Sequence, residues 1–95
     1  MSKESFEWDS EKDIYNKMKH SVSFDEAQLA FSDPNRLFYV DKDHCQTEQR
    51  YFCFGKVKNR ILTVRFTYRG SIFRIIGAGY WRKGRKIYEK ENRIQ

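Results

Sequence analysis

The chain has 95 residues, of which 39% are hydrophobic and 17% aromatic, and its formal net charge at pH 7 is +6. A chain of this length closes about one hydrophobic core, so the composition favours a single domain over residues 1–95 rather than two. No run approaches the roughly 18 apolar residues of a transmembrane helix and the first residues are too charged for a signal segment, so we expect a cytoplasmic protein.

The first predicted elements are a short edge strand and a helix. Apolar and charged residues alternate over residues 6–8, and Asp9 then supplies the N-cap of a helix over residues 10–19. The apolar residues of this helix recur every three to four positions, which makes it amphipathic. They are Ile14, Tyr15 and Met18, and they leave Lys12, Asn16, Lys17 and Lys19 on the other faces.

A second helix is predicted to start at Ser23. Ser23 and Glu26 match a capping box, in which each side chain satisfies a backbone N–H group at the start of the helix. Helical spacing continues to the turn sequence 33–35, where Pro34 stops it. Two helices joined by so short a link form a hairpin.

From residue 36 the pattern changes from helix to strand. Runs rich in aromatic and β-branched residues cover 36–40, 50–56, 60–68 and 71–78. Short turns at 58–59 and 69–70 separate the last three runs, so the four strands form an antiparallel meander.

A basic stretch over residues 82–86 leads into a C-terminal helix that contains Ile87, Tyr88 and Ile94. We therefore predict an α+β fold. Two N-terminal helices pack on a four-stranded antiparallel sheet, to which the segment 6–8 adds a short edge strand if it pairs, and a C-terminal helix follows.

Charge is distributed unevenly along the chain. Residues 1–49 hold six Lys or Arg against eleven Asp or Glu, a net charge of −5, whereas residues 50–95 hold thirteen against two, a net charge of +11. A basic region of this kind attracts phosphates or an acidic partner protein. The competing interpretation is that the charge serves solubility.

The two cysteines do not indicate a metal site. Cys45 and Cys53 stand eight positions apart without a second pair of ligands at a suitable spacing, so we expect no metal and no cofactor. Cys53 lies in an apolar run and is expected to be buried, whereas Cys45 lies in a polar stretch and is expected at the surface.

Three arginines are the first candidates for contact with phosphate. Arg65 and Arg69 alternate with apolar residues along the strand 60–68, so they share one face of the sheet. An antiparallel neighbour places Arg74 near the same level. Guanidinium groups grip phosphate oxygens bidentately, and surface ion pairs with the acidic first half are the alternative role.

The other candidates are a histidine and an aromatic, basic segment. RNA cleavage without a metal needs a base, an acid and cations for the developing charge. His20 is either such an acid or base, or a cap favoured by the helix dipole. The aromatic candidates either stack on bases or belong to the core. The predicted RNA-binding residues are Lys19, Tyr68, Tyr80, Trp81, Arg82 and Lys83.

A set of short motifs is distributed over nearly the whole chain. The first are Phe6-Glu7-Trp8-Asp9, Lys12, Asn16, Lys19-His20, Val22-Ser23-Phe24 and Glu26-Ala27. The later ones are Asp33-Pro34, Asp43-His44, Glu48, Arg50, Gly55, Phe66-Thr67-Tyr68-Arg69 and Arg74-Ile75-Ile76. In order and spacing, this set resembles the BrnT toxins of bacterial type II toxin–antitoxin pairs.

The resemblance implies a RelE-like ribonuclease fold, with two helices on an antiparallel sheet and a C-terminal helix. It also implies a partner, a BrnA-like antitoxin encoded beside the toxin. That antitoxin covers the toxin and contacts operator DNA, so the toxin meets the operator only through its partner.

The chain departs from the family pattern after Ile76. Family members usually continue with a Ser-Ala-Arg motif and a later Glu-Arg pair. Here Gly79 stands at the place of the family arginine, and Gly84 lies near that of the glutamate. If those two residues serve catalysis, this chain has lost them, which leaves altered or absent activity open.

Three functions compete on these grounds. The first is an endoribonuclease toxin that acts without a metal, inhibits translation and is neutralised by its antitoxin, with His20, Arg65, Arg69 and Arg74 as the catalytic set. The second is a non-catalytic binding module that acts through antitoxin complex formation or operator repression. The third is a general RNA-binding protein without an antitoxin, whose affinity falls steeply with salt.

Overall fold

A five-stranded sheet forms the centre of the computed structural model, which describes residues 5–44 and 48–93. The strands are β1 (Ser5–Trp8), β2 (Leu37–Asp41), β3 (Arg50–Val57), β4 (Arg60–Arg69) and β5 (Ile72–Gly79). Their order across the sheet is β1-β5-β4-β3-β2. Strands β2 to β5 form the antiparallel meander that the sequence predicts.

The segment at residues 6–8 does join the sheet, and it corrects the prediction of a purely antiparallel one. Strand β1 pairs with β5 in parallel, so the sheet is mixed and has five strands. Phe6 and Trp8 pack against the core, and Glu7 points to the opposite face. Pairing also satisfies backbone groups along the edge of β5 that would otherwise be open.

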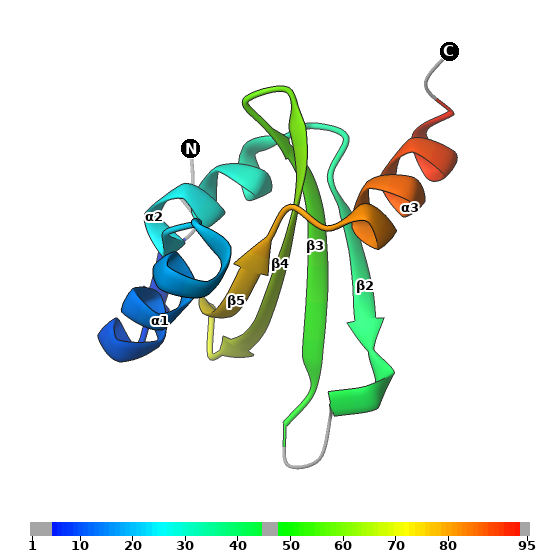
Figure 1. Ribbon diagram of the computed structural model, residues 1–95. Helices are drawn as coiled ribbons and strands as arrows, with labels where there is room; N and C mark the ends of the chain where they lie inside the picture. The colour runs from blue at the N-terminus through cyan, green and yellow to red at the C-terminus, as the bar shows by residue number, and fades with distance from the viewer. Residues whose placement is uncertain (1–4, 45–47, 94–95) are drawn as a thin grey trace.

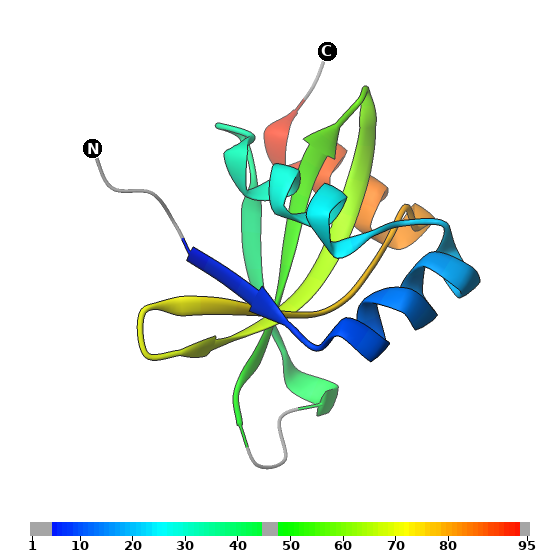
Figure 2. The same ribbon diagram turned by 90° about the vertical axis from the view of Figure 1, so that its left-hand side faces the viewer.

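Helices cover both faces of the sheet. Figure 1 shows α1 (Ser10–His20) and α2 (Phe24–Ala27) on one side and α3 (Arg82–Asn92) on the other. The second predicted helix is shorter than expected, because the chain changes after Ala27 into a 3-10 helix, η1 (Gln28–Ser32). Figure 2 shows α2 and η1 crossing in front of the strands, with α3 behind them. A single turn of 3-10 helix, η2 (Lys42–His44), follows β2.

The main core lies between the sheet and the α2–η1 segment. Its fully buried side chains include Phe24, Leu62, Val64 and Phe66. Gly55 allows η1 to lie directly on β3, because a β-carbon there would overlap the backbone of Ala30. Cys53 is buried in this core, as predicted, and Cys45 lies outside the described residues.

Helix α1 packs on the rest of the protein through its polar side. Asn16 is buried, donates its amide to the carbonyl oxygens of Val22 and Ala78 at 2.9 Å each, and accepts the Ala78 N–H at 3.2 Å. The apolar residues Ile14 and Met18 are 56% and 80% exposed. A surface helix usually turns its apolar stripe to the core, so α1 reverses the common arrangement.

Helix α3 packs closely on the other face. At its start, a β-carbon on Gly84 would overlap Thr63 and Phe54, so glycine permits this approach. Further along, the Tyr88 hydroxyl donates to the carboxylate of Asp33 at 2.6 Å. Burial and this bond to Asp33 raise the pKa of Tyr88 to about 12. The predicted helix residue Ile94 lies outside the described residues.

Candidate nucleic-acid interface

The β3–β4 hairpin fixes the position of Arg60. Its two turn residues, Lys58 and Asn59, have φ angles of 52° and 66°, and two left-handed residues are what a tight two-residue hairpin turn requires. Arg60 then begins β4 opposite Val57. The turn therefore presents Lys58 and Arg60 at one end of the sheet.

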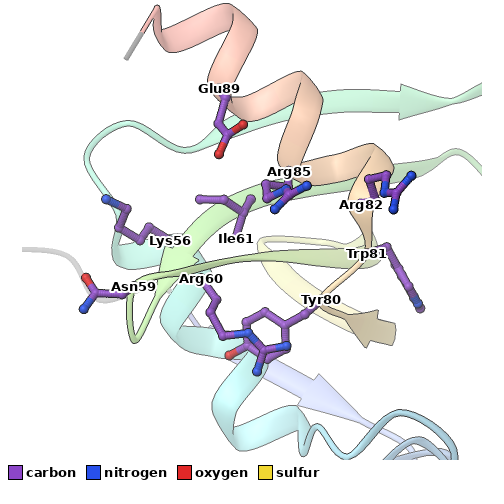
Figure 3. Close-up of a pocket in the computed structure, with 9 residues that line it drawn as sticks. All are labelled: Lys56, Asn59, Arg60, Ile61, Tyr80, Trp81, Arg82, Arg85 and Glu89. Carbon is purple, nitrogen blue, oxygen red and sulfur yellow. The ribbon is translucent and has the colours of Figure 1, made fainter. Parts of the chain in front are cut away.

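Arg60, Tyr80 and Glu26 form a linked group at this end. The guanidinium of Arg60 lies 3.9 Å from the centre of the Tyr80 ring, and Figure 3 shows the two side chains in contact. The Tyr80 hydroxyl donates a hydrogen bond to the Glu26 carboxylate. Burial and Glu26 raise the pKa of Tyr80 to about 12 against the opposing effect of Arg60, so the phenol is neutral at physiological pH and acts as a donor.

The Glu26 side chain does not have the role that the capping box predicts, which is to accept a backbone N–H at the start of α2. Ser23 does cap α2, because its hydroxyl accepts the Glu26 N–H at 3.0 Å. The Glu26 carboxylate, however, binds the Tyr80 hydroxyl 54 positions along the chain. The residue therefore connects α2 to the segment between β5 and α3.

Trp81 and His20 form the neighbouring group. Their ring centres are 5.1 Å apart and the rings are nearly perpendicular, at 89°. Trp81 is 39% exposed and occupies the N-cap of α3 without a side-chain cap. A β-carbon on Gly79 would overlap the Trp81 indole, so glycine at this position makes room for the ring.

Two grooves meet at these side chains. One, of about 520 Å³, is lined by Lys56, Asn59, Arg60, Ile61, Tyr80, Trp81, Arg82, Arg85 and Glu89. Figure 3 shows that they come from the β3–β4 hairpin, the β5–α3 link and α3. The other, of about 620 Å³, is lined by His20, Ser21, Glu26, Lys58, Arg60, Tyr80 and Trp81. Arg60, Tyr80 and Trp81 line both grooves. We call the combined region the Arg60 surface and define it by His20, Glu26, Lys58, Arg60, Tyr80, Trp81, Arg82 and Arg85.

The Arg60 surface carries unpaired positive charge. Among the described residues, no carboxylate lies within ion-pair distance of Lys58, Arg60, Arg82 or Arg85. Cations without a carboxylate partner, beside an exposed indole, suit the phosphates and bases of a nucleic acid.

Four of the residues predicted from the sequence come together at this surface: His20, Tyr80, Trp81 and Arg82. Sequence reasoning missed Lys58, Arg60, Glu26 and Arg85 as site residues. The hairpin turn at 58–59 was recognisable and points to the end of the sheet where Lys58 and Arg60 lie, but nothing in the sequence places Glu26 beside Tyr80.

The predicted row of sheet-face arginines lies elsewhere, and two of its three members are bound to carboxylates of the same chain. Arg65 pairs with the buried Asp41 at 3.2 Å, and Arg74 pairs with Glu7 at 2.9 Å. Arg65 lines a third groove, of about 520 Å³, together with Trp81 and Lys83. Arg69 is exposed at the far end of β4.

The two remaining predicted RNA-binding residues line neither groove of the Arg60 surface. Tyr68 is 44% exposed and packs against Tyr51 and Phe73. The Lys19 ammonium lies 5.5 Å from the centre of the Tyr15 ring on α1.

Neither a metal centre nor a membrane segment is found in the described part of the chain. Over residues 5–44 and 48–93, no three His, Cys, Asp or Glu side chains are grouped to hold a metal ion. None of the helices in these ranges has the length and apolar character of a membrane-spanning segment.

Comparison with known proteins identifies the family. Curated protein sequences give no match. The family model described as the ribonuclease toxin BrnT of type II toxin–antitoxin systems matches residues 8–84, which include α1, α2, the strands β2 to β5 and the start of α3. Because this match spans most of the 95 residues, the chain belongs to the BrnT family of type II toxin–antitoxin ribonuclease toxins.

Proposed function

We propose that this toxin is an endoribonuclease that binds and cleaves RNA at the Arg60 surface without a metal. The observation that carries the proposal is a single groove lined by a carboxylate, an imidazole and a guanidinium, from Glu26, His20 and Arg60. These are the groups that metal-independent RNA cleavage requires.

Each group has a role in the reaction. Glu26 accepts the proton of the ribose 2′-hydroxyl, whose oxygen attacks the adjacent phosphorus. His20 in its protonated form donates a proton to the 5′-oxygen as the P–O5′ bond breaks, which leaves a 2′,3′-cyclic phosphate and a free 5′-hydroxyl. Arg60 stabilises the negative charge that develops on the phosphate oxygens.

Tyr80 and Trp81 support this chemistry. Tyr80 holds the Glu26 carboxylate through its hydroxyl and lies against Arg60 with its ring, so it positions both groups. Trp81, with 39% of its surface exposed, offers an indole face on which a base can stack. Lys58, Arg82 and Arg85 add positive charge for the RNA backbone.

The proposal also accounts for the departure from the family pattern. Gly79 and Gly84 provide neither the arginine nor the glutamate that the resemblance leads us to expect at these places. Arg60 and Glu26 supply the same two functional groups from β4 and α2.

The sheet-face arginines have other roles in this proposal. Arg74 joins β1 to β5 through its ion pair with Glu7, which is a structural function. Arg65 is held by its ion pair with the buried Asp41, so we assign it a structural role on the wall of the third groove. Arg69 takes no part in cleavage.

Membership of the family implies an antitoxin partner. We propose that the partner is BrnA-like and that it alone contacts operator DNA. The toxin cleaves RNA in the cytoplasm and thereby inhibits translation. The four-stranded meander between N-terminal helices and a C-terminal helix supports a RelE-like fold.

The test uses purified, antitoxin-free protein and single-stranded RNA in the presence of a chelator. We expect products that end in a 2′,3′-cyclic phosphate. Arg60→Ala and His20→Ala should each lower the cleavage rate by about 100-fold or more. The matched control Arg74→Ala, which also removes a guanidinium, should stay within about threefold of the wild type after its folding is checked by thermal melting.

A non-catalytic antitoxin-binding module is the second candidate. It is favoured by the space beside Gly79, which the Trp81 indole fills and where the resemblance leads us to expect an arginine. It predicts that RNA stays intact after long incubation, while the protein still binds its antitoxin and contributes to operator repression. Intact RNA in the cleavage assay would therefore decide for this candidate.

A further inference from the structure

Helix α1 carries an apolar stripe that is more than half exposed in the described structure. Ile14, Tyr15 and Met18 are 56%, 61% and 80% exposed, and they lie together because residues three and four apart share one face of a helix. We call these three residues the α1 stripe. Single exposed apolar residues are common, but a contiguous group of them marks an interaction surface.

The stripe is not needed to hold α1 in place. The helix is attached through its opposite side, where Asn16 binds the backbone of Val22 and Ala78. Asp13 adds a second attachment by accepting the Phe24 N–H at 2.8 Å. The apolar residues therefore contribute little to the fold and are free to serve a partner.

The charges around the stripe indicate what kind of partner fits. Lys12, Lys17 and Lys19 are exposed on α1 beside the stripe, and Glu11 lies at its N-terminal end. Lys17 is 3.6 Å from the partly exposed Asp13, a weak surface pair. A border that is mainly basic suits an amphipathic helix with an apolar row between acidic residues.

The position of the stripe connects it with the Arg60 surface. Helix α1 ends at His20, which lines the groove with Glu26 and Arg60. A partner segment on α1 that continues past His20 would lie over the RNA-binding residues. The stripe alone is too small for a stable homodimer, whose interface usually buries about 800 Å² on each partner, so it suits one contact of a longer binding segment.

We propose that the α1 stripe anchors an amphipathic helix of the antitoxin. The apolar row of that helix packs on Ile14, Tyr15 and Met18, and its acidic residues meet the surrounding lysines. The antitoxin chain then continues over the Arg60 surface and excludes RNA. The proposal rests on the antitoxin partner that family membership implies, and it is independent of the catalytic roles given to His20 and Arg60.

The experiment measures the affinity of the full-length toxin for the antitoxin encoded beside it, by calorimetric titration. The double variant Ile14→Ser with Met18→Ser should bind at least about tenfold more weakly, because truncating apolar anchors removes most of the binding energy of such a contact. The matched control is Val40→Ser, which is on β2 at the opposite edge of the sheet and is 48% exposed. It should change the affinity by less than about threefold.

A charge-reversal variant tests the acidic flanks. Lys12→Glu with Lys19→Glu should also weaken binding, and the remaining affinity should depend less on salt than that of the wild type. Thermal melts and antitoxin-free RNA cleavage by the stripe variant should match the wild type, which separates this proposal from the catalytic one.

Three results would overturn the proposal. The first is wild-type affinity of the stripe variant for the antitoxin. The second is an equal loss of affinity in the Val40→Ser control, which would show that α1 is not the anchor. The third is a change in the toxin's own oligomeric state on mutation of the stripe without a change in antitoxin affinity, which would assign the stripe to a second copy of this chain.

Discussion

Two tyrosines donate hydrogen bonds to carboxylates from distant parts of the chain, and both do so as neutral phenols. Tyr80 binds Glu26, and Tyr88 binds Asp33, which also accepts the Lys56 N–H at 2.7 Å. Burial alone would raise the pKa of Asp33, but the hydrogen bonds outweigh it and hold that pKa below its ordinary value. The tyrosine hydroxyls are thus donors that the folded state keeps protonated.

This arrangement predicts a loss of stability in alkali. The pKa of each tyrosine is about 12 in the folded protein against an ordinary value of 10.0. Below pH 10 both states carry the proton, so the stabilisation is complete. Between about pH 10 and pH 12 the unfolded chain loses its protons first, and the free energy of unfolding should fall. Urea denaturation at a series of pH values measures the free energy of unfolding. It should fall less for Tyr88→Phe than for the wild type over this pH range. An equal fall would contradict the raised pKa of Tyr88.

At the residue scale the sequence predicts types of residue better than it predicts their partners. The aromatic and basic segment at 80–82 and the histidine at position 20 do meet at one surface. Arg65 and Arg74 lie on the sheet face that alternation predicts, yet each is bound by a carboxylate from the first half of the chain. Such pairs join residues 24 and 67 positions apart, and no local pattern reveals them.

Helix α1 shows the same limit at the scale of an element. Its start follows from the Asp9 cap, whose carboxylate accepts the Glu11 N–H at 2.8 Å. The periodicity of its apolar residues does not predict its orientation, because the side that is buried is the one that carries Asn16. The link to Ala78 fixes that orientation, and a single buried amide with three hydrogen bonds outweighs an apolar stripe that stays largely exposed.

The orientation of α1 can be tested by substitution. Asn16→Ala leaves backbone groups of Val22 and Ala78 buried without a partner, so it should lower the free energy of unfolding by roughly 2 to 4 kcal/mol. Met18→Ala on the same helix removes an exposed side chain and should change it by less than about 0.5 kcal/mol. Chemical denaturation compares the two, and a larger effect at Met18 would show that the helix faces the other way.

Strand β1 was recognisable as a strand but not as a parallel one. Three alternating residues suffice to indicate an edge strand, and the meander follows from its short turns. The direction of pairing depends on how α1 and α2 return the chain across the sheet, which is a property of the assembled fold.

The charge asymmetry of the whole chain explains where the molecule can bind a polyanion. Carboxylates of the acidic first half neutralise Arg65 and Arg74 of the basic second half. The end of the sheet formed by the β3–β4 hairpin and α3 keeps its cations without such partners among the described residues. The Arg60 surface therefore gathers four such cations, Lys58, Arg60, Arg82 and Arg85, although the sequence places arginines along the entire sheet.

The most direct test of this account is a nuclear magnetic resonance titration of the antitoxin-free toxin with a 2′-O-methyl RNA oligonucleotide, which binds but cannot be cleaved. The account predicts that the largest chemical-shift changes occur at His20, Arg60, Tyr80 and the Trp81 indole, with little change at β1 and Arg74. Shift changes that follow Arg65, Arg69 and Arg74 across the sheet, while the Arg60 surface stays unchanged, would contradict it.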